Sequence, residues 1–187
     1  MPPDGTPRAA SAFARADEIV IPGIAADGSL YPIEKIAAHR AGALHLAVSV
    51  FVFSGDRLLV QRRAAGKYHC AGLWANTCCT HPHWDEPPAL SAARRLHEEL
   101  GLALTLTHTG IIDYEADVSG DMRECERVHV YRGVADARRL AVTPDPAEVS
   151  ETRWATVDEL RVDALARPEA YAPWFRIYLE RWSELGL

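Results

Sequence analysis

The chain has 187 residues, of which 26 are acidic and 20 are Lys or Arg, so its formal net charge is −6. A basic face is the usual mark of a nucleic-acid binder, and this charge balance excludes nucleic acid as a main partner. No stretch reaches the roughly 18 apolar residues that span a bilayer, which excludes a membrane-spanning protein. The length suits one domain that buries about 70% of its unfolded surface.

Residues 1–17 carry Pro, Ala and Arg but no apolar segment. This composition predicts a flexible tail without a secretory signal, followed by a single domain over residues 18–187. A chain of this kind is expected in the cytoplasm, where thiols stay reduced. We therefore expect no disulfide among Cys70, Cys78, Cys79 and Cys125.

The first regular elements are expected in the middle of the chain. The segment 44–53 is rich in β-branched and aromatic residues and predicts a buried strand. Residues 54–56 (SGD) are a turn signal, and residues 57–62 return as a second strand, which makes a hairpin. Residues 64–82 are expected to be irregular.

A helix is expected to begin near residues 85–88, where acidic residues precede two prolines. Leu90, Ala93, Leu96 and Leu100 form its apolar stripe, and Gly101 ends it. The later elements are expected as strands at 104–115, 127–133 and 150–155, a helix capped by Thr156 through 157–160, and an amphipathic helix over 171–185. This order predicts one α/β domain with a mixed sheet and helices on its faces.

The helix at 86–102 ends in the charged run RRLHEELGL, residues 94–102. Arg95 and Glu99 are four apart, so they share a helix face and can pair. Taken alone, such a charge pattern is typical of a solvated, salt-bridged surface. The spacing of Glu86, seven residues and then Arg94 adds a second interpretation, because it resembles the Nudix box.

Two positions depart from that box. Thr80 stands where the box has its first glycine, and Arg95 replaces the glutamate that follows the arginine. The hydrolysis of nucleoside diphosphates relies on a full carboxylate set that holds Mg²⁺ around a pyrophosphate. The resemblance therefore implies a Nudix fold with a chemistry other than that hydrolysis.

A second constellation surrounds the box. It comprises the segments EKIAAH (34–39), LHL (44–46), WANTCCTHP (74–82) and ECE (124–126). Glu124 and Glu126 would point the same way on a strand. Three imidazoles and two carboxylates form a mixed N/O ligand set that suits Mn²⁺, Zn²⁺ or Mg²⁺. A structural zinc site of cysteines and His81 is disfavoured, because Cys78 and Cys79 are adjacent and no Cys-x2-Cys pair exists.

Together these segments resemble type 1 isopentenyl diphosphate isomerase over about residues 18–180. The resemblance implies the α+β Nudix fold, with its mixed sheet sandwiched between helices. It implies that Cys79 and Glu126 are the two catalytic acid/base groups, on opposite faces of the carbon skeleton. Tyr114 would assist the acidic group, and the ring of Trp174 would face a cationic centre.

The same resemblance implies two cation sites and a diphosphate site. Mn²⁺, Zn²⁺ or Mg²⁺ would bind tightly to His39, His45, His81, Glu124 and Glu126. Glu99 would hold a Mg²⁺ that also contacts the substrate diphosphate, and Arg63, Lys67 and Arg95 would grip that diphosphate. We expect Cys78 to be packed away and Cys125 to point to the opposite face as a core residue. His69, His83, His97, His108 and His129 match no ligand of the family and are expected at the surface or in packing.

The residue types suit the implied reaction. Moving a double bond requires a proton to be added at one carbon and removed at another, through a tertiary carbocation or a transition state like it. A thiol and a cation-tuned carboxylate can exchange those protons, and an indole face can stabilise the positive charge. We expect a monomeric enzyme that interconverts isopentenyl and dimethylallyl diphosphate. A Nudix hydrolase, a catalytically silent Nudix-fold binding domain and an isomerase of a longer prenyl diphosphate are the alternatives.

Overall fold

The computed structural model describes residues 19–118 and 121–187, so the predicted tail over residues 1–17 lies outside the described part of the chain. The strand that organises this part is β3 (His45–Ser54), which is buried at nearly every position. Its β-branched and aromatic residues fit a pleated surface that is covered on both sides. β3 pairs in parallel with β8 (Met122–Val134), from His45 opposite Glu126 to Phe53 opposite Val134.

The other strands pair antiparallel and make the sheet mixed, as predicted. β6 (Cys78–Thr80) lies beside β3, and β7 (Leu106–Val118) forms a long hairpin with β8. The remaining strands are β1 (Val20–Ile24), β2 (Leu30–Glu34), β4 (Arg57–Arg63), β5 (Trp74–Ala75) and β9 (Val149–Thr156). The helices are α1 (Lys35–Ala41), α2 (Pro88–Leu100), α3 (Val157–Ala166) and α4 (Pro173–Glu180).

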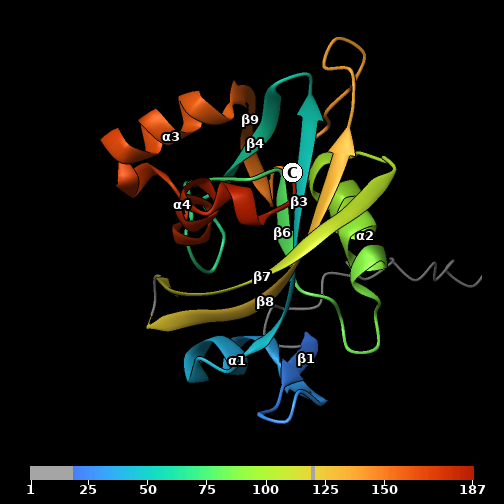
Figure 1. Cartoon of the computed structure of the whole chain (residues 1–187), viewed down its shortest axis with the longest axis vertical. Helices are drawn as coiled ribbons and strands as arrows, with labels where there is room; N and C mark the ends of the chain where they lie inside the picture. The colour runs from blue at the N-terminus through green and yellow to red at the C-terminus, as the bar shows by residue number, and fades with distance from the viewer. Residues whose placement is uncertain (1–18, 119–120) are drawn as a thin grey trace, which may run out of the picture.

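Helices cover opposite faces of this sheet (Figure 1): α2 lies on one side of β3, and α3 and α4 lie on the other. Successive side chains of a strand point to opposite faces. Ala47 and Phe51 therefore pack in the cluster with α4, while Val48, Val50 and Val52 pack against α2. The predicted α/β class, with a mixed sheet between helices, is confirmed. No helix of the described residues is long and apolar enough to cross a membrane.

The hairpin between β3 and β4 is confirmed, with Phe53 opposite Leu58 and Ser54 opposite Arg57. Gly55 has φ 61° in the two-residue turn, a conformation that glycine adopts without a steric penalty. The segment 64–82 is not wholly irregular, because it contains β5 and β6. The sequence did not predict these strands, because each is only two or three residues long and therefore too short to show a periodic pattern. Their pairing partners are also distant in sequence.

The apolar stripe predicted for α2 is partly wrong. Leu90 is 61% exposed and Ala93 is exposed, whereas Ala92, Leu96 and Leu100 are buried. Glu99 shares the buried face because Arg95 and Gln61 satisfy its carboxylate. Because the charged residue Glu99 is part of the buried face of α2, the apolar residues alone do not identify that face. Gly101 ends the helix with φ 68°, as expected.

The last helix is shorter than the predicted 171–185. Tyr171 forms a bridge with Trp74, and α4 begins only at Pro173 and ends at Glu180, before a separate 3-10 turn at Trp182–Glu184. Proline at the first helical position explains this start. Trp174, Phe175 and Tyr178 are buried on the face toward the sheet, so the amphipathic character was predicted correctly even though the bounds were not.

Asp163 of α3 ties this helix to the segment that leads into α4. Its carboxylate accepts hydrogen bonds from Arg167, Tyr171 and Arg153. The hydrogen bonds from Arg167 and Tyr171 lower the pKa of Asp163 from 3.8 to about 2. α3 itself begins at the expected cap, where Thr156 and Glu159 form a capping box.

We predict that Asp163→Asn lowers the free energy of unfolding by about 2 kcal/mol at neutral pH, because charge-assisted hydrogen bonds are lost. A carboxyl with a lowered folded-state pKa stabilises the fold above its unfolded pKa, and this contribution disappears as the pH falls through about 2. The difference between the two proteins should therefore shrink from about pH 4 downward in urea unfolding. Asp158→Asn, at an exposed site on the same helix, is the control, and an equal loss there would contradict the prediction.

Candidate active site and metal cluster

One cleft of about 570 Å³ collects the side chains that the sequence singled out. Every predicted site residue lines it except His39 and His45, which are fully buried and pack against the ring of His81. The residues from the predicted set that line it are Cys79, Glu126, Tyr114, Trp174, Arg63, Lys67, Arg95, His81, Glu124 and Glu99. Residues that are far apart in the sequence thus form one site.

The register of the sheet explains how the metal cluster forms. His45 of β3 lies opposite Glu126 of β8, and Glu126 lies opposite Tyr114 of β7. Nε2 of His81 lies 2.9 Å from Glu126 Oε1 and 3.2 Å from Nε2 of His45. Two neighbouring ligands of one ion, each bonded at about 2.1 Å, stand about 3.0 Å apart at a right angle. These donor atoms are therefore spaced like ligands of a single ion.

The main chain orients two of the imidazoles. Nδ1 of His39 donates to the carbonyl of Lys35, and Nδ1 of His45 donates to the carbonyl of Ala43, each at 2.7 Å. A hydrogen bond of this kind sets the tautomer and leaves the lone pair on Nε2. Nε2 of His39 is fully buried and has no hydrogen-bond partner among residues 19–118 and 121–187. Together with His81 and Glu126 these imidazoles form a buried group that can hold a metal ion.

The two carboxylates of β8 share one phenol. The hydroxyl of Tyr114 lies 2.8 Å from Glu124 Oε2 and 2.7 Å from Glu126 Oε2, and both glutamates are buried. Burial and repulsion from Glu126 raise the pKa of Glu124 well above its usual range. Burial also opposes ionisation of Glu126, but His81 and His45 hold the pKa of Glu126 well below its usual range. A divalent cation is the group that lets both carboxylates ionise at once, so the donor set fits a metal.

His69 is the histidine that the sequence left outside this cluster. It is 4% exposed and forms a second candidate metal group with His39 and Glu124. Burial, followed by the charge of Arg63, lowers the pKa of His69 to about 2, which keeps the ring neutral. The expectation that His69 is a surface or packing residue is only partly correct. Its ring packs against Trp174, but it also faces Glu124.

Cys79 lies on the face of β6 that looks into the cleft, where it pairs with Ser49 of β3. Its Sγ donates to Asn76 Oδ1 at 2.8 Å and lies 3.2 Å from the hydroxyl of Ser49, which in turn contacts Tyr178. Burial raises the pKa of Cys79 to about 12, although its hydrogen bonds with Ser49 and Asn76 oppose this effect. The thiol therefore carries its proton in a fixed position.

The two neighbouring cysteines take other faces. Cys78 is fully buried in the cluster with α2, as expected for a packed residue. Cys125 points away from Glu124 and Glu126, as predicted, but it is not a core residue. It is partly exposed and contacts Glu115 of β7, because β7 and β8 are covered by protein on one face only at this point.

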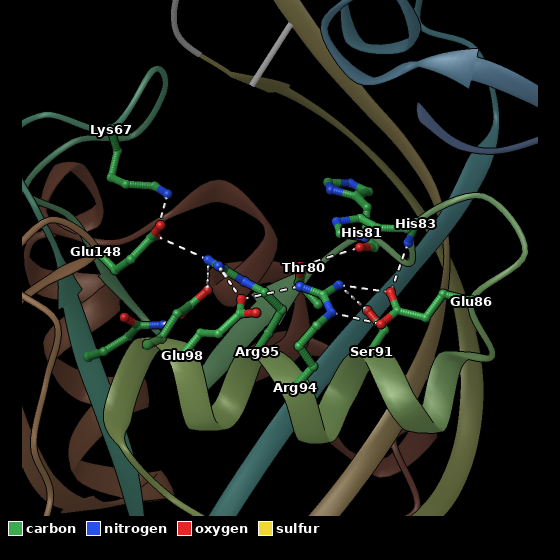
Figure 2. Close-up of polar contacts among 12 residues, drawn as sticks. Lys67, Thr80, His81, His83, Glu86, Ser91, Arg94, Arg95, Glu98 and Glu148 are labelled. Carbon is green, nitrogen blue, oxygen red and sulfur yellow. Dashed lines mark hydrogen bonds and ion pairs between the residues drawn. The ribbon is translucent and has the colours of Figure 1, made fainter. Parts of the chain in front are cut away.

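Five Lys and Arg side chains also line the cleft: Lys35, Arg63, Lys67, Arg94 and Arg95. Figure 2 shows Lys67 and Arg95 meeting at the carboxylate of Glu148, with Nζ of Lys67 2.5 Å and Nη2 of Arg95 3.1 Å from Oε2. Arg63 instead donates to the carbonyl of His69. The sequence analysis missed Lys35 and Glu148. The i, i+4 spacing of Lys35 to His39 on one short helix was the available signal for Lys35.

Burial and the neighbouring charges of Lys67 and Arg95 lower the pKa of Lys35 to about 7. Mutual repulsion of this kind arises where cations converge without enough carboxylates between them. The same cations would be relieved by a polyanionic ligand, which makes this end of the cleft suited to a diphosphate.

Arg95 occupies the centre of the degenerate Nudix box. Its guanidinium donates to Glu98 at 2.8 Å and to Glu99 at 2.6 Å, while Arg94 pairs with Glu86 (Figure 2). The surface interpretation of this helix therefore holds for Glu98, which is exposed, and not for Glu99, which is buried. Glu99 lies outside the two His/Glu groups. Its oxygens accept hydrogen bonds from Gln61 and Arg95, and a carboxylate has about four lone-pair sites, so it can also bind a cation.

Trp174 closes the cleft from α4. It is 2% exposed, the guanidinium of Arg63 lies 5.3 Å from its ring centroid, and the ring of His69 lies edge-on at 5.8 Å. The indole is thus held beside the candidate metal cluster and already attracts one cation through its face.

Comparison with known proteins agrees with this architecture. The family model described as the NUDIX domain matches residues 43–176. The structure is similar to that of DR0079 from Deinococcus radiodurans, with a TM-score of 0.70 and 16% identity over 87% of this chain and 98% of that one. It is also similar to the MutT NUDIX hydrolase from Burkholderia pseudomallei, with a TM-score of 0.55 and 24% identity over 73% and 96% of the two chains. The fold and the site thus define a NUDIX-domain protein.

Sequence relatives narrow this class. The chain is 52% identical to the isopentenyl-diphosphate Delta-isomerase of Dinoroseobacter shibae over 84% of its length and 90% of the relative's. It is 48% identical to the protein of the same name from Rhodobacter capsulatus, over 85% and 90% of the two chains. The chain belongs to the isopentenyl-diphosphate Delta-isomerase family of NUDIX-domain enzymes. The family predicted from the sequence is confirmed.

We predict that metal-free protein gains thermal stability on addition of Zn²⁺ or Mn²⁺. An ion at 100 times its Kd stabilises the fold by about 2.7 kcal/mol, or about 5–10 °C in Tm for a chain of this length. His45→Gln should remove most of the rise in a calorimetric melt, because it deletes a buried donor atom of the cluster. His129→Gln is the control, since it removes an imidazole from the partly exposed pair with His108, which lies outside the cluster. An equal loss in both variants would contradict the prediction.

Proposed function

We propose that the chain interconverts isopentenyl diphosphate and dimethylallyl diphosphate, with Cys79 and Glu126 as the two groups that exchange protons with the substrate. Membership of the isomerase family supplies the activity. The observation that supports the two roles is the placement of a fixed, protonated thiol and a buried carboxylate in one cleft.

The proposed reaction balances without an oxidant or a hydrolytic water. The π electrons of the terminal double bond take a proton and form a C–H bond at the end carbon, which leaves positive charge at the tertiary carbon. A C–H bond then breaks at the neighbouring methylene on the diphosphate side, and its electron pair forms the new double bond. One protein group gives the first proton, the other takes the second, and their roles exchange when the reaction runs in reverse.

Each proton-transfer group is held by neighbours that suit this role. Asn76 and Ser49 fix the sulfur of Cys79, and the rigid pairing of β6 with β3 sets the direction of its side chain. Tyr114 donates to Glu126, so a proton can pass between the phenol and the carboxylate. A divalent cation bound by His39, His45, His81, Glu124 and Glu126 would supply positive charge that keeps the carboxylates ionised. Mn²⁺, Zn²⁺ and Mg²⁺ all remain candidates for this ion.

Burial of the side chains that line the cleft would protect the carbocation from water. Trp174 and Tyr114 are nearly fully buried where they line the cleft, so water has little access to the carbon skeleton there. An indole face stabilises a desolvated cation by up to about 2 kcal/mol. Exclusion of water matters because water would trap the carbocation as an alcohol.

The diphosphate would lie at the cationic end of the cleft, against Arg63, Lys67 and Arg95, with Lys35 as a fourth contact. Glu148 pairs with Lys67 and Arg95 in the structure, and a diphosphate would compete with it for both cations. We propose that Glu99 holds a Mg²⁺ that bridges to the diphosphate. These assignments extend the family resemblance to named side chains, in a chain that we expect to act as a cytoplasmic monomer.

A NUDIX hydrolase is the main alternative, since one structural neighbour carries that name. Its chemistry needs several carboxylates free to bind Mg²⁺. Arg95 instead pairs with Glu98, and Arg94 pairs with Glu86, so that of these box carboxylates only Glu99 is assigned to a Mg²⁺. This charge pattern favours the isomerase.

The first test is proton NMR of isopentenyl diphosphate in D₂O with the enzyme and Mg²⁺. We expect dimethylallyl diphosphate with deuterium incorporated from solvent-exchanged protein groups, and no inorganic phosphate in a parallel assay. Release of phosphate or pyrophosphate would instead identify a hydrolase. Absence of any change with this substrate, in protein that carries metal, would overturn the proposal for the five-carbon substrate.

The second test separates the two proton-transfer groups from their neighbours. Cys79→Ala and Glu126→Gln should each lower kcat about 10²- to 10⁴-fold, the usual contribution of a general acid or base. Cys125→Ala removes a thiol from the outer face of β8, next to Glu126 in sequence, and should leave kcat unchanged. Circular dichroism checks that all three fold. Near-normal turnover by either catalytic variant would refute its assigned role.

The third test concerns the diphosphate. Lys67→Met should raise KM about 10- to 100-fold with a smaller effect on kcat, because a charge-assisted contact to the non-reacting part of the substrate is lost. Arg139→Met, at a side chain that is 89% exposed, is the control for the change in net charge. An unchanged KM for Lys67→Met would place the diphosphate elsewhere.

A further inference from the structure

We propose that His69 is an additional ligand of the buried metal ion, which makes the coordination shell four imidazoles and two carboxylates, all from the protein. The inference rests on the proposed function only in that both use the cluster around Glu126. It concerns the chemistry of the ion and not the identity of the substrate.

The position of His69 is the first observation. Its Nε2 lies 3.7 Å from Glu124 Oε1, and its donor atom, that of His39 and that of Glu124 all lie within 4.8 Å of one another. Opposite ligands of one six-coordinate ion with bonds of about 2.1 Å stand about 4.2 Å apart, and neighbouring ones about 3.0 Å. The spacing of this group therefore suits ligands of one ion after shifts of a few tenths of an ångström.

The second observation is an unsatisfied ring. Nδ1 of His69 is fully buried and has no hydrogen-bond partner among the described residues, and the same is true of Nε2 of His39. A buried polar atom without a partner costs free energy, and native structures rarely contain one without a reason. A cation bound through Nε2 of His39 removes the cost at that ring. His69 would bind the same cation through Nε2, the nitrogen that faces Glu124, with Nδ1 as the N–H.

The shared residue His39 limits the number of ions. His39 occurs in both groups, one with His45, His81 and Glu126, and the other with His69 and Glu124. Its Nδ1 is already committed to the carbonyl of Lys35, so a single lone pair remains. That lone pair can bind one ion only. One ion contacted by both groups uses every donor atom, but the two groups must close on it, because their donor atoms do not all lie within 4.8 Å of one another. Two ions would leave one group without His39.

The surroundings hold His69 in place for this role. Arg63 donates to its carbonyl, and its ring packs edge-on against Trp174 and Tyr68. Residue 70 follows with φ 50°, a conformation uncommon for a side chain other than glycine. The backbone therefore bends directly after His69.

Two chemical consequences follow from six protein ligands. A closed shell has no position for a bound water, so the ion stabilises carboxylates without delivering hydroxide to the carbocation. Four imidazoles also favour Zn²⁺, Co²⁺ or Mn²⁺ over Mg²⁺, which prefers oxygen ligands and keeps several waters. The tightly bound ion would then differ in kind from the Mg²⁺ proposed at Glu99.

The test counts ligands in substrate-free protein loaded with Co²⁺ or Zn²⁺. X-ray absorption should give four imidazoles in the wild type and three in His69→Gln. The weak visible absorption of six-coordinate Co²⁺ should grow severalfold in the variant as the coordination number falls. Zn²⁺ affinity, measured against a chromophoric chelator, should fall by more than the roughly 10- to 100-fold that follows loss of an orienting hydrogen bond. His97→Gln, on the exposed face of α2, should change none of these.

His69→Leu is the second variant, because it fills the same buried space without a polar atom, and circular dichroism of both metal-free variants checks their folding. The same imidazole count and affinity in wild type and folded His69→Gln would overturn the inference, whatever the activity. A wild type with four imidazoles that fails to isomerise the five-carbon substrate would overturn the proposed function and leave the ligand assignment standing. A wild type that binds no ion would overturn the assignment.

Discussion

The site depends on the register of β3 against its neighbours. The parallel pairing with β8 puts His45 opposite Glu126, and the antiparallel pairing with β6 puts Ser49 opposite Cys79. Because side chains alternate between faces, a shift of one residue would send Cys78 into the cleft and bury Cys79 against α2. The apolar residues of β3 prevent such a shift, since Phe51 and Val50 are fully buried on opposite faces. Packing of the core thus sets the geometry of the acid/base pair and of the metal cluster together.

Charge compensation distinguishes this cleft from that of a metal-dependent hydrolase on the same fold. In the box of α2 the guanidinium of Arg95 lies among Glu98, Glu99 and Glu148, where a hydrolase would need cations and free carboxylates. The divalent-ion donors instead lie on α1, on β3, on β8 and directly after β6, around Glu126. With arginine at position 95 in place of the glutamate of the box, most of the carboxylate and imidazole groups that can bind a divalent ion lie around Glu126 and not on α2.

Sequence patterns predicted the class of fold, the hairpin of β3 and β4, the cap of α3 and ten of the residues that line the cleft. They succeeded where the signal is local, as in the turn at Gly55, or where a motif is shared with the isomerase family. They failed where tertiary contacts determine which residues are buried and which residues meet in the cleft. Leu90 is 61% exposed, whereas Glu99, satisfied by Arg95 and Gln61, lies on the buried face. His69 and Glu148 were missed because their partners come from β8, α1 and α2, and no spacing in the chain records that contact.

The orientation of the imidazoles by the main chain has a consequence for how this protein can vary. The groups that set the tautomers of His39 and His45 are the carbonyls of residues 35 and 43, not their side chains. A carbonyl is retained by any substitution, so the outer support of these ligands is insensitive to mutation at both positions. Natural drift or a designed library can therefore change the charge and size of residue 35, which faces the cationic end of the cleft, while the metal ligands beside it keep their alignment.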